Sequence, residues 1–117
     1  MKMSKNYFIT GGAGFIGSNY VHRLLTRSEK VIIYDNLSRA GAKRNLDWLR
    51  ETFGEKAFTL INGDVRQADL LAASCREADV ILHLAAQVAV TTSVTEPRQD
   101  FEVNALGTFN LLEAARL

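Results

Sequence analysis

Cysteine, proline and long apolar runs are scarce in this sequence, and each shortage excludes a class of protein. The single cysteine, Cys75, has no second thiol with which to form an internal disulfide or a thiolate metal site. The longest apolar run, residues 80–90, is interrupted by His83 and Gln87 and is far shorter than the ~20 residues that span a bilayer. Residues 1–5 lead into a strand-like run without a secretory signal pattern. We therefore expect a cytoplasmic protein in a reducing compartment, with no membrane partner.

The sequence also lacks an excess of positive or of negative charge. The chain has 14 basic and 13 acidic residues, for a formal net charge of +1. This balance gives no electrostatic footprint for nucleic acid, so we expect none as a partner. Apolar residues make up 47% and charged residues 23% of the 117 positions, which are globular proportions. We expect one folded domain over residues 1–117.

Strand-like and helix-like patterns alternate along the whole chain. Apolar, β-branched runs predict four strands, at residues 6–10, 30–35, 58–61 and 80–84. Helical spacing of apolar residues predicts four helices, at residues 15–27, 46–53, 69–77 and from Pro97 to the last residue. This alternation predicts an α/β fold, the first half of a Rossmann-like doubly wound parallel sheet with strand order 3-2-1-4. Since the last helical pattern reaches Leu117 without a glycine cap, we expect a truncated chain.

Four glycines follow the first predicted strand. Gly12, Gly14 and Gly17 match the Gly-x-Gly-x-x-Gly spacing, and Gly11 extends the pattern. Because the match follows a strand and opens a helix, it predicts a loop for the pyrophosphate of a dinucleotide, against the alternative of a turn that only connects the two elements. The early glycines would form the turn, Gly14 would let the backbone approach the phosphates, and Gly17 would allow close packing of helix on strand. Amides at the helix start would face the anion.

Carboxylates follow the second and third predicted strands. Asp35 lies near the ~20-residue spacing from the glycine loop that is typical of the group binding the adenosine ribose. A carboxylate there would repel a 2′-phosphate, which favours NAD, although the guanidinium of Arg39 could receive that phosphate and leaves NADP open. Asp64 is positioned to reach the adenine edge, with Val65 against the ring. The alternative for Asp64 is a cap of the helix that follows.

The two histidines and the cysteine are interpreted as structural. His83 lies inside an apolar strand with no second metal ligand nearby, so a hydrogen-bonded core histidine is favoured over a catalytic one. We expect His22 on a solvated helix face and Cys75 in the core or at its boundary. No metal site is expected.

Five blocks of the sequence carry a family resemblance that covers nearly the whole chain: residues 10–18, 35–38, 63–66, 83–87 and 100–108. They resemble the extended short-chain dehydrogenase/reductase family, the NAD-dependent epimerases and dehydratases that act on nucleotide sugars. The resemblance implies NAD as the cofactor, held by Gly11, Gly14, Phe15, Ile16, Gly17, Asp35, Asn36, Ser38, Arg39, Asp64, Val65, Leu84, Ala85, Ala86 and, near the nicotinamide, Asn104. It places Gln87, Thr91, Thr92 and Ser93 at the sugar pocket, although the three hydroxyls are equally well explained as a turn and cap before the Pro97 helix.

Within this family, residues 35–41, 45–49 and 87–93 resemble a branch of epimerases that act on CDP-sugars, so a CDP-sugar is the favoured substrate. A 4-epimerase or 4,6-dehydratase of another nucleotide sugar is the alternative, and a non-catalytic dinucleotide-binding module is an alternative of another class. The family's catalytic tyrosine, followed four residues later by lysine, is absent, because Tyr7, Tyr20 and Tyr34 lack that lysine. We therefore expect no catalytic residue within these 117 positions and no epimerase activity of the chain alone. We also expect exposed apolar surface on the last helix and a homo-oligomer for the full-length protein.

Overall fold

The computed structural model describes residues 4–86 and 90–116, except that the side chains of residues 90–92 are outside the description. Strands and helices alternate through the first part of the chain: β1 (Asn6–Thr10), α1 (Phe15–Thr26), β2 (Lys30–Asp35), α2 (Ala42–Phe53), β3 (Thr59–Asn62), α3 (Ala68–Ser74) and β4 (Val80–His83). Four helical segments follow: α4 (Val90–Thr95), α5 (Pro97–Phe101), the π-helix η1 (Glu102–Leu106) and α6 (Gly107–Arg116).

The four strands form one parallel sheet in the order β3-β2-β1-β4, so the predicted strand order is confirmed. β1 lies in the middle, where Ile9 pairs with Ile33 of β2 on one side and with Leu82 of β4 on the other. Because all strands run the same way, the glycine loop, Asp35, Asp64 and His83 follow or end strands at one common edge.

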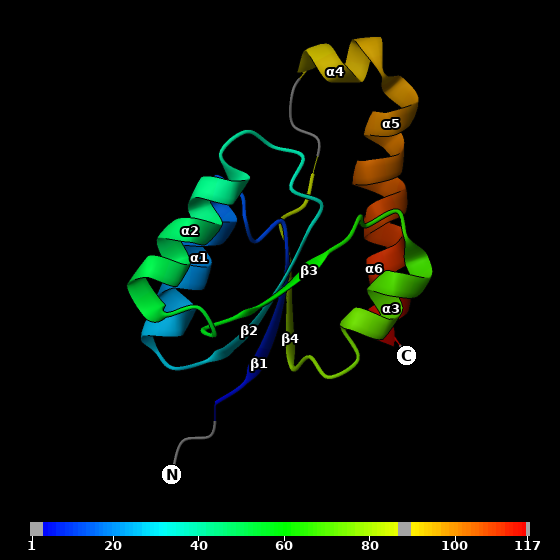
Figure 1. Cartoon of the computed structure of the whole chain (residues 1–117). Helices are drawn as coiled ribbons and strands as arrows, with labels where there is room; N and C mark the ends of the chain where they lie inside the picture. Colours follow the sequence, from blue (N-terminus) through cyan, green and yellow to red (C-terminus); the bar gives the residue numbers. More distant parts are fainter. Residues whose placement is uncertain (1–3, 87–89, 117) are drawn as a thin grey trace.

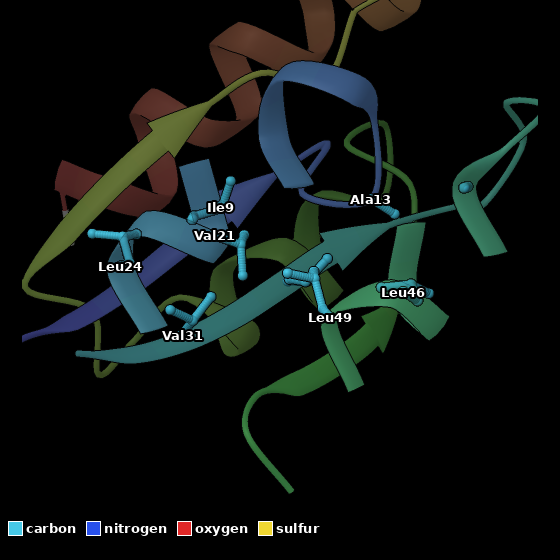
Figure 2. Packing of buried hydrophobic residues seen from close by; sticks show 9 residues of the cluster. Ile9, Ala13, Val21, Leu24, Val31, Leu46 and Leu49 are labelled. Atoms are coloured by element: carbon cyan, nitrogen blue, oxygen red, sulfur yellow. The ribbon is translucent and has the colours of Figure 1, made fainter. Parts of the chain in front are cut away.

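Helices cover both faces of the sheet (Figure 1). α1 and α2 pack on one face, and α3 with α6 on the other. Successive strand residues point to opposite faces, so Phe8 and Ile9 of β1 enter two different cores. Figure 2 shows the first core, in which Ile9 and Val31 from the strands meet Val21 and Leu49 from the helices. The two cores fix the spacing of the strand ends that carry the candidate site.

The last helical pattern is not one α-helix, as the sequence predicted. It is interrupted by η1, in which the N–H of Gly107 donates to the carbonyl of Glu102, five residues back. A Cβ on Gly107 would lie 2.5 Å from Cγ2 of Val65, so only glycine allows this close approach of the helix to the strand-end loop. The segment α4 was likewise not predicted as a helix. Local spacing of apolar residues did not reveal either feature.

The exposed side of α5 and α6 is apolar, as expected from the sequence. Phe101, Phe109 and Leu112 are 62%, 58% and 65% exposed. Several predicted boundaries shifted: α2 begins at Ala42, before the predicted start at 46, β3 is Thr59–Asn62, and α3 ends at Ser74, before the predicted end at 77. The ends of α1 and β4 and the start of α3 differ by one residue. Within the described part of the chain, no helix is both long enough and apolar enough to cross a membrane.

Candidate functional site

An open cavity of about 510 Å³ lies at the carboxyl edge of the sheet. Its wall combines the glycine loop, the ends of β2, β3 and β4, and one side of α5–η1. Fourteen of the residues predicted from the sequence line it: Gly11, Gly14, Phe15, Ile16, Gly17, Asp35, Asn36, Ser38, Arg39, Asp64, Val65, Leu84, Ala85 and Ala86. The remaining lining residues were missed: Tyr34, Ala42, Gly63, Arg66, Gln99 and Val103. The sequence therefore predicted the wall made by the glycine loop and the strand ends. It did not predict the wall made by Gln99 and Val103, which depends on tertiary packing.

The glycine loop is a tight turn against β4. Gly11 has a φ of +71° and accepts the N–H of Gly14 at 3.1 Å. A Cβ on Gly11 would lie 2.7 Å from the amide nitrogen of Ala85, and one on Gly17 would collide with the carbonyl oxygen of Gly11. A Cβ on Gly14, by contrast, would have only the Gly11 oxygen within 4 Å, at 3.3 Å. Gly11 and Gly17 are therefore required by packing, while Gly14 keeps the cavity clear.

The first turn of α1 opens directly onto this cavity. Gly14 precedes the helix without a side-chain cap, and Phe15 and Ile16, which begin the helix, are 81% and 67% exposed. The positive end of a helix dipole and the amide groups of a first turn favour an anion at such a position. A 12-residue helix aimed at a glycine-lined hollow is suited to phosphate oxygens.

Asp35 ties the end of β2 to the glycine loop. Its Oδ2 accepts the N–H of Ala13 at 3.1 Å, and its Oδ1 accepts the N–H of Leu37 at 2.7 Å. Leu37 has a φ of +59°, a left-handed conformation that is unusual for leucine, and its side chain packs against the first core. The carboxylate is thus held in one orientation at the cavity wall, and each oxygen retains further acceptor capacity.

Arg39 reaches across the cavity from the β2 loop to the β4 loop. Its Nη2 donates to the carbonyl oxygen of Ala86 at 3.2 Å. This is the guanidinium that the sequence analysis named as the alternative receptor for a 2′-phosphate. One of its N–H groups is hydrogen-bonded to the Ala86 carbonyl. The two loops are joined above the sheet edge by this single long side chain.

Asp64 is held by Arg66, a residue that the sequence interpretation missed although it directly follows the Asp64-Val65 pair. The guanidinium donates from Nε to Oδ1 at 2.9 Å and from Nη2 to Oδ2 at 2.8 Å, and Asn36 adds a bond to Oδ2 at 3.2 Å. The Arg66 hydrogen bonds lower the pKa of Asp64 to about 2, despite the opposing effect of burial. The helix-cap alternative is wrong, because Gln67 precedes α3 and the Asp64 carboxylate instead accepts the N–H of Arg66.

Tyr34 forms the floor beneath Asp64. It is 1% exposed, its hydroxyl donates to the Asp64 carbonyl at 2.7 Å, and Gly63 leaves the space that its ring occupies. Burial, reinforced by the nearby Asp64 carboxylate, raises the pKa of Tyr34 to about 12. Tyr34 therefore stays protonated as a fixed hydrogen-bond donor.

The two histidines and the cysteine lie outside the cavity wall. His83 is a hydrogen-bonded core histidine, as expected, and Cys75 is buried, which raises the pKa of its thiol. His22 does not lie on a solvated face: its ring stacks on Trp48 with centroids 4.9 Å apart, between α1 and α2. Among residues 4–86 and 90–116, no group of three His, Cys, Asp or Glu could hold a metal ion.

Among the described residues, Asn104 and Ser93 do not line the cavity. Asn104 lies in η1, where its Nδ2 donates to Oδ1 of Asp100 at 3.3 Å. Ser93 lies in α4 and is half-buried. Thr91 and Thr92 also belong to α4, but their side chains, like the whole of Gln87, lie outside the described residues.

Known proteins resemble this chain in sequence over most of its length. Residues 8–117 match the family model described as GDP-mannose 4,6 dehydratase. CDP-paratose 2-epimerase of Salmonella typhi is 46% identical over 110 residues, which are 92% of this chain and 32% of that protein. dTDP-glucose 4,6-dehydratase of Mycobacterium tuberculosis is 36% identical over the same shares of each chain.

A solved structure gives the same result for the fold. UDP-glucose-4-epimerase of Stenotrophomonas maltophila, with bound NAD and formylated UDP-arabinopyranose, has a TM-score of 0.85 at 32% identity and is matched by 96% of this chain and 33% of its own. The chain thus spans about a third of the length of its relatives. The family model covers residues 8–117, and the chain belongs to the GDP-mannose 4,6 dehydratase family of NAD-dependent epimerases and dehydratases.

Proposed function

We propose that this chain binds NAD in the cavity, as the dinucleotide-binding domain of a nucleotide-sugar epimerase. The observation that carries the proposal is the glycine loop at the start of α1, which opens onto a hollow large enough for part of a dinucleotide at the carboxyl edge of a parallel sheet. Ligands of open α/β sheets bind at this edge. Residues 1–117 would form this domain, within a longer protein.

The residues present fit such a group. Gly11 and Gly17 allow the tight turn, in which a Cβ would collide with protein backbone, and the open space at Gly14 suits a close approach of backbone to pyrophosphate. Phe15 and Ile16 would present the first-turn amides to it. When bound, NAD would supply the acceptor and later the donor of a hydride, and the protein would orient it and exclude water.

We propose that the cavity has an end for the adenosine and an end toward the nicotinamide. In our proposal Asp35 binds the adenosine ribose, with Asn36, Ser38 and Arg39 around it. Asp64 and Val65 would take the adenine. Leu84, Ala85 and Ala86 would line the remaining ribose and pyrophosphate, and Asn104 would lie toward the nicotinamide.

NAD is favoured over NADP for two reasons. The Asp35 carboxylate is fixed in the cavity wall by the Ala13 and Leu37 amides, where it would repel a 2′-phosphate. The competing cation, Arg39, is engaged with the Ala86 carbonyl. A 2′-phosphate bound by Arg39 would share the guanidinium with the Ala86 carbonyl and would still face the Asp35 carboxylate.

For the substrate, we favour a CDP-sugar and the 2-epimerase reaction, in which a transient oxidation at carbon 2 is followed by reduction from the other face. The 46% identity to CDP-paratose 2-epimerase supports this choice, together with the motifs at residues 35–41 and 87–93. Gln87, Thr91, Thr92 and Ser93 remain candidates for contacts with the sugar. A 4-epimerase or 4,6-dehydratase is the alternative within the family, and the full-length protein would be a cytosolic homo-oligomer.

Calorimetric titration of the purified chain with NAD and with NADP tests the cofactor proposal. We expect saturable NAD binding that is tighter than NADP binding. Absence of binding by a folded chain would contradict the cofactor site, and tighter NADP binding would assign the adenosine end to Arg39 instead of Asp35.

A further inference from the structure

A line of hydrogen bonds runs behind the cavity wall, from the β4 loop to the π-helix. Oγ1 of Thr10, at the end of β1, lies 2.7 Å from Nδ1 of His83, and Nε2 of that ring lies 3.0 Å from Oγ1 of Thr108 in α6. Thr10 is fully buried. The three side chains connect β1 and β4 to α6.

The proton positions in this line follow from the groups at its far end. The hydroxyl of Thr108 is 2.6 Å from the backbone carbonyl oxygen of Asn104, which can only accept. The single hydroxyl hydrogen of Thr108 therefore points to Asn104. Its oxygen is left to accept, so Nε2 of His83 must carry the hydrogen in their shared bond.

The positions of the hydrogens at the Thr10 end of the line are then determined as well. With its hydrogen on Nε2, neutral His83 has a bare Nδ1, which accepts from the Thr10 hydroxyl. The oxygen of that hydroxyl accepts the N–H of Leu84 at 3.0 Å and of Ala85 at 3.2 Å. Every donor thus points the same way, from the cavity-lining amides to the Asn104 carbonyl in η1, and hydrogen bonds aligned in this manner strengthen one another.

We propose that His83 is a positioning residue, held as the neutral Nε2–H tautomer, which fixes the Leu84–Ala86 wall against the glycine loop through Thr10. A proton on Nδ1 would place three donors around the Thr10 oxygen and leave the Thr10 hydroxyl without its acceptor. The tight contact between Gly11 and the Ala85 amide would then lose the support behind it. Burial lowers the pKa of His83, in agreement with a neutral ring.

The tautomer is tested directly by ¹⁵N NMR of the His83 ring in the wild-type chain at neutral pH, without nucleotide. We expect a protonated Nε2 and an unprotonated Nδ1, with His22 as the second histidine in the spectrum. A protonated Nδ1, or a doubly protonated ring, would overturn the proposal. This measurement does not depend on NAD binding, so it stands apart from the proposed function.

The positioning role rests on the proposed NAD site and needs matched variants. Thr10→Val removes the hydroxyl at constant shape, and Thr10→Ser keeps it. We expect NAD affinity to fall roughly tenfold or more in Thr10→Val relative to Thr10→Ser, because the Ala85 amide loses its acceptor and the Leu84 amide keeps only the Thr10 carbonyl oxygen. Equal affinities of the two folded variants would overturn the role.

Thr108→Val gives a second readout that survives if Thr10→Val does not fold. Without the Thr108 oxygen, Nε2–H loses its acceptor, and we expect the ¹⁵N spectrum to shift toward the Nδ1–H form. Thr108→Ser should restore the wild-type ring pattern. An unchanged ring in Thr108→Val would contradict the assignment of the hydrogen bond.

Discussion

The guanidinium of Arg66 and the carboxylate of Asp64 meet edge to edge, with Nε 2.9 Å from Oδ1 and Nη2 2.8 Å from Oδ2. This pair keeps the pKa of Asp64 at about 2, below the ordinary value of 3.8. A carboxylate with a lowered pKa in the folded state contributes stability above its unfolded pKa. The contribution is lost as the pH falls from 3.8 toward about 2.

Arg66→Met should therefore raise the pKa of Asp64 and remove this part of the acid dependence of stability. NMR titration of the Asp64 carboxyl carbon and thermal unfolding between pH 2 and 6 measure both effects. Arg116→Met is the matched control, because Arg116 pairs with Glu113 on α6, whereas Arg98 shares its partner Glu102 with Arg66. An unchanged Asp64 titration in Arg66→Met would show that other groups set its pKa.

Gly14 and Gly17 should respond differently to a side chain. Gly14→Val leaves room for folding but fills the space beside the α1 amides, so we expect a folded chain without measurable NAD affinity. Gly17→Ala drives a Cβ into the Gly11 carbonyl, so we expect a loss of stability first. Calorimetry and thermal unfolding of both variants separate the outcomes, and wild-type NAD affinity in folded Gly14→Val would remove the phosphate loop from the proposal.

Asp35 should determine the choice between NAD and NADP. Asp35→Asn keeps an oxygen for one backbone amide but removes the negative charge that opposes a 2′-phosphate. We expect the ratio of NAD to NADP affinity to fall toward one. Arg39→Met is the companion variant, in which NADP affinity should not rise; a retained NAD preference in Asp35→Asn would contradict the assignment.

Leu49 and Leu112 allow a matched test of the core. Leu49 is 0% exposed between α2 and the sheet, and Leu112 is 65% exposed on α6. We expect Leu49→Ala to lower the free energy of unfolding by about 2–5 kcal/mol. Leu112→Ala should change it by about 0.5 kcal/mol or less. Chemical denaturation measures both, and similar values would contradict the described packing.

The 117 residues alone should not interconvert CDP-paratose and CDP-tyvelose. Removal of hydride needs a general base, which contributes roughly 10²- to 10⁴-fold, and none of the three tyrosines precedes a lysine by four positions. NMR of the sugar during incubation with NAD follows the reaction. Turnover at rates ordinary for enzymes would show that acid/base groups already lie within this chain.

Local spacing was enough for the parts of the site that follow strand ends. The glycine loop, Asp35 and Asp64 each follow or end a β-branched run, and parallel strands bring such segments to one edge. Residues 84–86 were assigned to the cofactor by the family resemblance, and they line the same cavity. The order of the strands followed from the same alternation.

The parts that depend on contacts between distant segments were not predictable in this way. Gln99 in α5 and Val103 in η1 line the cavity. The following helix packs closely against Val65, an approach that the missing Cβ of Gly107 allows. His22 is stacked on Trp48, which lies on another helix. Such contacts have no periodicity within a single element, so sequence patterns carry no signal for them.

The π-helix η1 also determines how α6 is rotated about the helix axis relative to α5. Its hydrogen bond spans five residues where an α-helix spans four, which amounts to one residue inserted into the helix. One residue corresponds to about 100° of rotation in a helix of 3.6 residues per turn. Deleting a single position between 102 and 106 would therefore turn all of α6, carrying Thr108 away from His83 and Leu111 out of the core. Length variation, normally tolerated at helix ends and in loops, should be excluded from this segment.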